Sequence, residues 1–460
     1  MNERMPLGVV EGFYGPPWSH AARLDMIKFL GKNGFNVYIY APKDDPYHRE
    51  KWAEPYPKSL FAKLAQLVKT SRRSGVNFCF AVSPGLSMRY SSDSDFQKLS
   101  TKFAEVAKLG VEWFGLFLDD IPDELQHEED KAAFSSLGEA HAHLGNELEK
   151  KLREIVGDGS RLILCPTQYI GVQPTDYHRA LGEKLSQSVH VMWTGKYVCT
   201  PSITAEDADS FGTGIGRKPF LWDNYPVNDY AHQLKIFLGP VRRRSPDLLE
   251  YLSGFVSNPM NQAEASKFAL LTYREYFKDP ARYDPDKAWE RAVKGLMPKA
   301  MWKPFLSLSE HSRGSFLDFR ESERLSQLLE SVKHNPRDQN SAKALSDYLI
   351  LQRRAISHIA RQLKGPLRTE LMPMTRKISD LLEVGIASTD LIRRTRKGVT
   401  KADRRKAKTI EAKLRKAEEN KYQVLGEVRL TLMDPERESM DRDNYISTLA
   451  KLAFSLTGGQ

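Results

Sequence analysis

The chain has 460 residues, 40% apolar and 28% charged, which is ordinary for a soluble globular protein and long enough for two or three domains. Most of its net charge of +10 comes from the basic segment between Arg393 and Lys421, where 13 Lys/Arg stand against 4 Asp/Glu. The rest of the chain is close to neutral. Because the basic segment also lacks interleaved aromatic residues, we expect no nucleic-acid partner.

The three cysteines, Cys79, Cys165 and Cys199, lie far apart and form no CxxC pair. They indicate buried thiols in a reducing compartment, and they predict neither a disulfide framework nor a metal site. The first residues lack the apolar core of a secretory signal, and no run reaches membrane-spanning length. We therefore expect a cytoplasmic protein with no membrane contact, no metal and no cofactor.

Apolar strand-like runs alternate with amphipathic helical runs between residues 8 and 270. The expected strands are Gly8–Tyr14, Asn36–Ala41, Asn77–Val82, Trp113–Leu118, Arg161–Pro166, Val189–Trp193, Lys218–Trp222 and Gly254–Ser257. The expected helices include Ser19–Lys32, Lys58–Ser74, Asp95–Leu109 and Lys131–Ile155. Eight β/α units in this length predict an α/β fold, a (β/α)8 TIM barrel, with a doubly wound sheet as the alternative.

Polar and aromatic residues follow nearly every expected strand, as in Glu11–Gly15, Pro42–Asp45, Thr167–Tyr169 and Trp222–Asp229. In both candidate folds the ligand site lies at the carboxyl ends of the strands. Any one of these segments could be a simple turn. Together, aromatic faces with interspersed amides and carboxylates suit a carbohydrate, which offers apolar C–H faces and many hydroxyls.

The run Phe114–Leu118 is expected to be a buried strand, and it ends in two adjacent carboxylates, Asp119 and Asp120. We interpret them as a catalytic acid pair; the alternative is that one caps a helix and the other faces solvent. Neighbouring Cα atoms are about 3.8 Å apart, so the pair is poorly placed to flank a sugar from opposite faces. This adjacency favours a substrate that supplies its own nucleophile, as a 2-acetamido group can.

The β/α alternation ends near residue 276, and long helical segments follow. We expect residues 1–275 to form the catalytic barrel and residues 276–460 an α-helical domain. Its helices should cover Ser341–Leu363 and Arg376–Glu436, the second interrupted near Gly398. The basic segment is typical of a charge-rich solvated helix, and a surface for an acidic partner is the alternative.

Short motifs occur in order between residues 8 and 260. They are Gly8-Val-Val-Glu-Gly-Phe-Tyr-Gly15, Tyr40-Ala-Pro-Lys-Asp-Asp45, Ser83-Pro-Gly-Leu86, Phe117-Leu-Asp-Asp-Ile121, Cys165-Pro-Thr-Gln-Tyr169, Trp193-Thr-Gly195, Trp222-Asp-Asn224, Asn228-Asp-Tyr230, Phe237-Leu-Gly-Pro240 and Asn258-Pro259. Through them the chain resembles the O-GlcNAcases of glycoside hydrolase family 84, as a bacterial homologue of the animal enzymes. The C-terminal half carries no comparable motif, although its helical character is similar to the domain that follows the barrel in this family.

The resemblance implies a retaining hydrolysis that removes β-linked N-acetylglucosamine from Ser/Thr of glycoproteins or glycopeptides. The substrate's own acetamide would attack, giving an oxazoline intermediate. Asp119 would accept the acetamide N–H and orient the carbonyl. Asp120 would be the general acid that protonates the glycosidic oxygen and then the base that activates water.

The resemblance also implies a set of substrate-binding residues, namely Gly12, Tyr14, Lys43, Cys165, Tyr169, Val198, Trp222, Asn224, Asp229 and Asn258. Taken singly, these have structural alternatives: Lys43 could pair with Asp44 or Asp45, and Asn224 could cap a turn. The sequence departs from the animal members at Gln168, where they carry an acidic residue.

Two other functions remain open from the sequence. The same site would serve a β-N-acetylglucosaminidase or hyaluronidase-like enzyme acting on polysaccharide fragments. A non-catalytic scaffold that uses the basic segment is a different class, and the intact Asp119 and Asp120 argue against it. The sequence predicts neither the natural substrate nor the oligomeric state.

Overall fold

A computed structural model describes residues 4–230, 233–427 and 443–458. The chain divides into two compact units. The first comprises the chain up to Asp229, Val241–Ala263 and Tyr273–Tyr283, and the second comprises Tyr230–Pro240, Glu264–Thr272 and the chain from Asp284. The expected assignment of catalysis to residues 1–275 stays a prediction.

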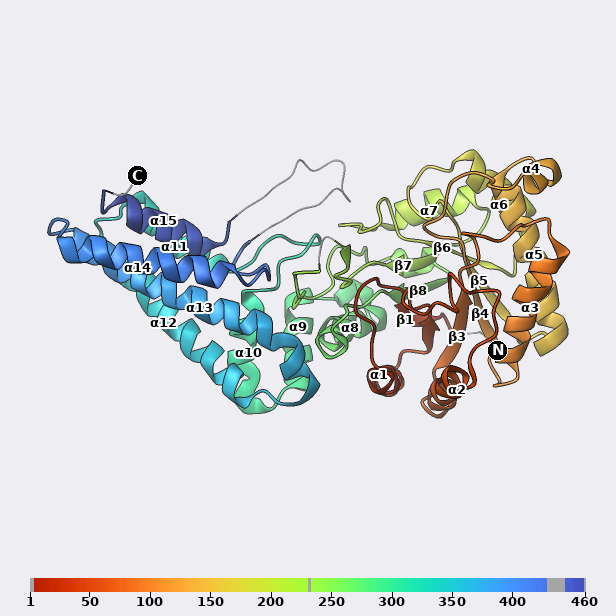
Figure 1. Cartoon of the computed structure of the whole chain (residues 1–460), viewed down its shortest axis with the longest axis horizontal. Helices are drawn as coiled ribbons and strands as arrows, with labels where there is room; N and C mark the ends of the chain where they lie inside the picture. The colour runs from red at the N-terminus through yellow and green to blue at the C-terminus, as the bar shows by residue number, and fades with distance from the viewer. Residues whose placement is uncertain (1–3, 231–232, 428–442, 459–460) are drawn as a thin grey trace. The chain divides into compact units, whose positions relative to one another are not determined.

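The first unit contains a closed barrel of eight parallel strands in sequence order, in which the first strand also pairs with the last (Figure 1). The expected TIM barrel is therefore confirmed, and the doubly wound alternative is wrong. The strands are β1 (Leu7–Glu11), β2 (Val37–Tyr40), β3 (Asn77–Val82), β4 (Trp113–Phe117), β5 (Arg161–Cys165), β6 (His190–Trp193), β7 (Phe220–Asp223) and β8 (Gly254–Ser257).

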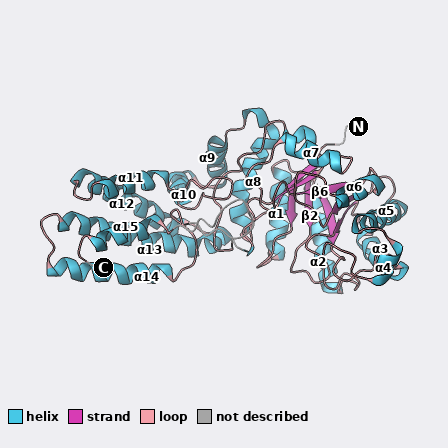
Figure 2. Ribbon diagram, turned by 90° about the horizontal axis from the view of Figure 1, so that it is seen from above, coloured by secondary structure: helices cyan, strands magenta, loops and turns pink. Residues whose placement is uncertain are grey.

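Helices surround these strands, as Figure 2 shows in cyan around magenta. They are α1 (His20–Lys32), α2 (Lys58–Arg73), α3 (Asp93–Ala107), α4 (Glu128–Ala133), α5 (Leu137–Val156), α6 (Asp176–Lys184) and α7 (Ala205–Gly214), with a short 3₁₀ turn at Leu248–Tyr251. The single helix expected over Lys131–Ile155 is wrong, because it is divided into α4 and α5. Phe134 has an extended backbone, and the Ser136 hydroxyl caps α5 by accepting the Glu139 N–H at 3.2 Å.

Side chains of alternate strand residues fill the barrel. They form one buried cluster that includes Val10, Ala41, Phe117, Trp222 and Val256. Strand β1 was expected to reach Tyr14 but ends at Glu11. Its ladder partner β2 ends at Tyr40, and the nearby Pro42 has no N–H with which to extend the pairing.

The second unit is helical. Its helices are α9 (Pro285–Leu296), α10 (Trp302–Glu310), α11 (Glu323–His334), α12 (Gln339–Gln362), α13 (Gly365–Thr395), α14 (Lys401–Glu418) and α15 (Tyr445–Ser455), with a 3₁₀ turn at Lys299–Met301. Helix α8 (Ala263–Lys278) has residues in both units, and a 3₁₀ turn at Pro280–Arg282 follows it.

The helix expected over Ser341–Leu363 corresponds to α12. The one expected over Arg376–Glu436 starts earlier, as α13, and is interrupted where Gly398 adopts a left-handed φ of 107°. Helix α14 then ends at Glu418, and the expected part beyond residue 427 lies outside the described residues. None of the described helices is both long and apolar enough to cross a membrane.

Candidate active site

The candidate site is continuous with the barrel interior, at the carboxyl ends of the strands. Val10, Ala41, Phe117, Trp222 and Val256 point inward, and side chains alternate along a strand, so the residue two positions further on should also face the barrel axis. These next positions are occupied by Gly12, Lys43, Asp119, Asn224 and Asn258. The period of the strands therefore brings five of the predicted site residues to one end of the barrel.

Lys43 and Asp119 form a buried ion pair. Lys43 Nζ donates to Asp119 Oδ2 at 2.5 Å, and the two residues are only 8% and 5% exposed. Lys43 thus pairs across the barrel mouth, neither with Asp44 nor with Asp45. The other carboxylate oxygen, Asp119 Oδ1, is buried and accepts no hydrogen bond from any residue that the structure describes. Because a buried acceptor normally receives a hydrogen bond, we expect this oxygen to accept one from a donor on a ligand.

Asp120 interrupts the strand alternation. Its φ of 53° lies in the left-handed region, which is unfavourable for a residue with a Cβ. An extended backbone would direct the Asp119 and Asp120 side chains to opposite faces of the strand. The bend at Asp120 lets its side chain reach residues that follow other strands of the barrel. Strain of about 1–3 kcal/mol per such residue is common at functional sites.

Two tyrosines donate to the Asp120 carboxylate from opposite sides. Tyr14 O–H reaches Oδ2 at 2.6 Å, and Tyr169 O–H reaches Oδ1 at 2.8 Å. The pKa of each phenol is raised above its usual value by burial and by the nearby Asp120 charge. Both tyrosines therefore remain protonated donors, and Asp120 is exposed and aimed by two fixed hydroxyls.

A chain of amides lies beside the two carboxylates. Asn224 Oδ1 accepts from Trp222 Nε1 at 2.8 Å and from Asn258 Nδ2 at 2.9 Å, while Asn224 Nδ2 donates to the Val198 carbonyl at 2.8 Å. Asn258 Oδ1 in turn accepts the Gly12 N–H at 3.4 Å. A Cβ at Gly12 would lie 2.4 Å from the Trp222 ring, so only glycine fits there.

Asp229 joins the site through Tyr14, whose backbone N–H donates to Asp229 Oδ2 at 2.9 Å. Burial raises the pKa of Asp229, and the hydrogen bond from Tyr14 opposes this shift. The apolar side of the site consists of Cys165, Trp222 and Phe117 in the interior cluster, with Tyr169 packed against them. Burial raises the pKa of the Cys165 thiol, so it is an apolar wall group.

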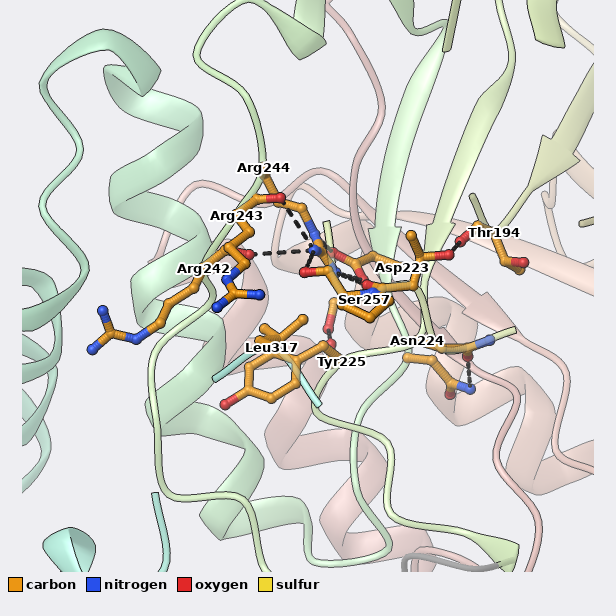
Figure 3. A network of polar contacts seen from close by, with 12 residues as sticks. Thr194, Asp223, Asn224, Tyr225, Arg242, Arg243, Arg244, Ser257 and Leu317 are labelled. Carbon is orange, nitrogen blue, oxygen red and sulfur yellow. Dashed lines mark hydrogen bonds and ion pairs between the residues drawn. The ribbon is translucent and has the colours of Figure 1, made fainter. Parts of the chain in front are cut away.

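The network in Figure 3 fixes the end of β7. Asp223 accepts from Arg244 Nε at 2.7 Å and from Nη2 at 2.6 Å, and it also accepts the Tyr273 O–H at 2.7 Å. Arg244 Nη2 additionally donates to the Thr200 carbonyl at 3.2 Å. Because this buried charge pair is formed by Asp223, the residue next to Asn224, it holds the backbone that presents Asn224.

The structure thus connects all of the predicted site residues. Sequence reasoning missed Arg49, whose guanidinium contacts Tyr14 and the backbone of Asp120. Arg49 follows the motif ending at Asp45 and lies at no strand end, so only its closeness to that motif could have suggested it. Gln168, the departure from the animal pattern, donates through Nε2 to both carboxylate oxygens of Asp123, at 2.9 and 2.7 Å.

Comparison with known proteins identifies relatives of this chain. Protein O-GlcNAcase of Rattus norvegicus and of Mus musculus are each 36% identical over 281 residues, or 60% of this chain. The match spans only 30% of the length of either relative. A mutant O-GlcNAc hydrolase of Thermobaculum terrenum has a similar structure, with a TM-score of 0.88, 30% identity and coverage of 97% of this chain and 93% of that one.

A second solved structure, that of CpGH84B, gives a TM-score of 0.83 at 29% identity and covers 97% of this chain and 77% of that one. A family model described as beta-N-acetylglucosaminidase matches residues 7–309, which include the whole barrel. The resemblance carried by the motifs is therefore confirmed, and the chain belongs to the beta-N-acetylglucosaminidase family, glycoside hydrolase family 84.

Proposed function

We propose that the chain is a retaining glycoside hydrolase that removes β-linked N-acetylglucosamine from Ser/Thr of glycoproteins or glycopeptides. The observation that carries this proposal is the asymmetry of Asp119, whose Oδ2 is held by Lys43 and whose buried Oδ1 has no partner among the described residues. An unmet buried acceptor costs about 1–3 kcal/mol. An acetamide N–H would satisfy it.

In the first step the acetamide oxygen of the substrate attacks C1 while the bond from C1 to the Ser/Thr oxygen breaks. Asp120 gives its proton to that oxygen, and Asp119 accepts a hydrogen bond from the acetamide N–H. In the second step a water loses a proton to Asp120 and attacks C1, so the oxazoline ring, which is still protonated on nitrogen, opens and the acetamide reforms. Two inversions at C1 give net retention.

The surrounding groups support this substrate. The ordered amides of Asn224 and Asn258, the Gly12 backbone, Lys43 and the Asp229 carboxylate would hold sugar hydroxyls. The apolar wall, made of Cys165, Tyr169 and Trp222, would enclose the acetyl methyl group together with Val198. Tyr14 would lie between Asp120 and Asp229, because its hydroxyl donates to Asp120 and its backbone N–H donates to Asp229.

We also propose that the first unit is catalytic and that the protein works in the cytoplasm on a protein or peptide partner. The three cysteines are free and buried, which suits a reducing compartment.

The test uses aryl 2-acetamido glycosides in which the acetyl group carries zero to three fluorines. Fluorine withdraws electrons from the carbonyl oxygen, so the rate should fall steeply with each substitution if that oxygen is the nucleophile. A rate that does not change with the number of fluorines would overturn the mechanism. Parallel assays on an O-GlcNAc peptide, hyaluronan and chitin fragments then determine the substrate class; preferential cleavage of either polysaccharide would favour the alternative enzyme.

A further inference from the structure

Arg49 lies in the loop between β2 and α2 and is only 8% exposed. The loop is fastened to β3 at the neighbouring residue, His48. The His48 ring bonds to the Ala81 carbonyl at 2.8 Å, and the His48 carbonyl accepts the Ser83 N–H at 2.7 Å. The backbone that carries Arg49 is therefore fixed relative to the barrel.

The Arg49 guanidinium holds Asp120 by one direct contact and by one contact through Tyr14. Nη2 donates to the Asp120 backbone carbonyl at 2.9 Å, and Nη1 donates to the Tyr14 hydroxyl oxygen at 3.2 Å. That hydroxyl in turn donates to the Asp120 carboxylate. Both acceptors of Arg49 are neutral oxygens, a phenol and a backbone carbonyl. The side chain thus connects the backbone of Asp120 to its carboxylate by way of Tyr14.

Each contact opposes a specific error in the placement of Asp120. The left-handed backbone at Asp120 has a tendency to relax, and a charge-assisted hydrogen bond to its carbonyl counteracts this. The bond to the Tyr14 oxygen leaves the Tyr14 hydrogen directed at the carboxylate. Asp119 is held separately, by Lys43, so a loss of Arg49 should disturb one carboxylate and spare the other.

We infer that Arg49 is a positioning residue for Asp120, an inference that rests on the proposed function. It touches no reacting atom. It sets the distance and direction from the Asp120 carboxyl to the leaving-group oxygen, and this matters most when the leaving group needs a proton. Acetamide attack, which depends on Asp119, does not require it.

The test compares kcat/KM for a 4-nitrophenyl glycoside, whose leaving group needs little protonation, with that for a serine glycopeptide. Arg49→Met should lower kcat/KM at least about tenfold more for the glycopeptide than for the 4-nitrophenyl glycoside, which is within the range that general acid catalysis contributes. Arg49→Lys should recover part of this loss. In an Asp120→Asn background, Arg49→Met should add less than about a threefold further loss, because the group that it positions is already gone.

Arg217→Met is the matched control, because Arg217 also donates to backbone carbonyls, those of Ser186 and Leu185, away from the site. This variant should lower Tm without changing the ratio of the kcat/KM values for the two substrates. Equal losses on both substrates for Arg49→Met and Arg49→Lys would overturn the inference and leave a purely structural role. If Arg49→Met does not fold, Arg49→Gln takes its place. A wild-type protein inactive on every 2-acetamido glycoside would overturn the proposed function as well.

Discussion

Asp119 and Asp120 are neighbours in sequence, yet their surroundings differ in a way that suits different tasks. Asp119 is buried and paired with the Lys43 cation, and its second carboxylate oxygen has no partner among the residues that the structure describes. Asp120 is exposed and surrounded by neutral hydroxyl donors, where it can exchange a proton with a leaving group or with water. The left-handed backbone at Asp120 makes this separation possible.

Changing Asp119 to Asn should lower kcat/KM by about a hundredfold or more for activated and poor leaving groups alike. The acetamide would lose its anionic acceptor in the first step, before any protonation matters, and charge-assisted hydrogen bonds are about twice as strong as neutral ones. The measurement is kcat/KM on aryl glycosides of increasing leaving-group pKa. Unchanged rates would remove Asp119 from the mechanism.

Changing Asp120 to Asn should produce a different pattern. The loss should be small for a 4-nitrophenyl glycoside and about 10²–10⁴-fold for a serine glycopeptide, which is the usual contribution of a general acid. Plots of log kcat/KM against leaving-group pKa should therefore become steeper in this variant. Parallel plots for variant and wild type would show that Asp120 is not the acid.

Lys43, Asp119 and Asn258 follow expected strands in the sequence, and in the structure they are in phase with the barrel interior, because side chains alternate along a strand with a period of two. Arg49 and Val198 have no such signal. Arg49 lies in a loop whose course depends on tertiary hydrogen bonds, and Val198 contributes a backbone carbonyl to Asn224, which any residue type could supply. Val198 was found only through the family resemblance.

At the scale of elements, a buried carboxylate fastens three segments of the helical unit together. Glu321 accepts from Lys235 Nζ at 2.5 Å, from the Gly314 N–H at 3.0 Å and from the Gly426 N–H at 3.1 Å. The side chains of Lys235 and Glu321 are only 6% and 2% exposed. Burial raises the pKa of Glu321, and the ion pair with Lys235 opposes that shift.

Glu321→Gln should lower the free energy of unfolding by about 3–5 kcal/mol, because it removes the negative charge from a buried ion pair. The measurement is the urea midpoint of the variant against wild type. Glu330→Gln is the matched control: its partner Lys333 and Glu330 itself are 42% and 63% exposed, so breaking that pair should cost no more than about 1 kcal/mol. Equal effects in the two variants would contradict this account.

Element types could be predicted from sequence more reliably than element ends. Every expected strand exists because each is an apolar run between turn residues. The division between α4 and α5 was missed although Ser136 and Glu139 form a capping signal, because helical periodicity continues on both sides of it. The end of β1 depends on where its partner strand stops, which no local pattern contains.

At the scale of the whole molecule, a change of periodicity near residue 276 marks where the β/α alternation ends. It cannot show which distant segments pack together. Tyr230–Pro240 and Glu264–Thr272 precede that point and nevertheless belong to the helical unit. Such grouping depends on contacts between residues far apart in sequence, for example those of Glu370 in α13 with the start of α8.

The Glu370 carboxylate accepts the backbone N–H groups of Glu264 and Ala265 at 3.1 and 2.9 Å. Burial raises the pKa of Glu370 from 4.5 to about 7; the two hydrogen bonds and Lys267 oppose the shift, and the Glu264 charge adds to it. Between these two values the folded state keeps a proton that the unfolded state releases. The stability that this proton supplies is therefore complete below pH 4.5 and is lost as the pH rises through about 7.

Glu370→Gln is neutral at every pH, so its stability relative to wild type should increase between pH 4.5 and about 7 and stay constant above. A shift of this size corresponds to roughly 3 kcal/mol across that window. At low pH the variant should be no more stable than wild type, because glutamine replaces a protonated carboxyl of nearly the same shape. The check is a series of urea unfolding curves from pH 4.5 to 8 for both proteins. A stability difference that does not change with pH would show that Glu370 is not protonated in the folded protein within this range, and the pH dependence of unfolding would then have to come from other groups.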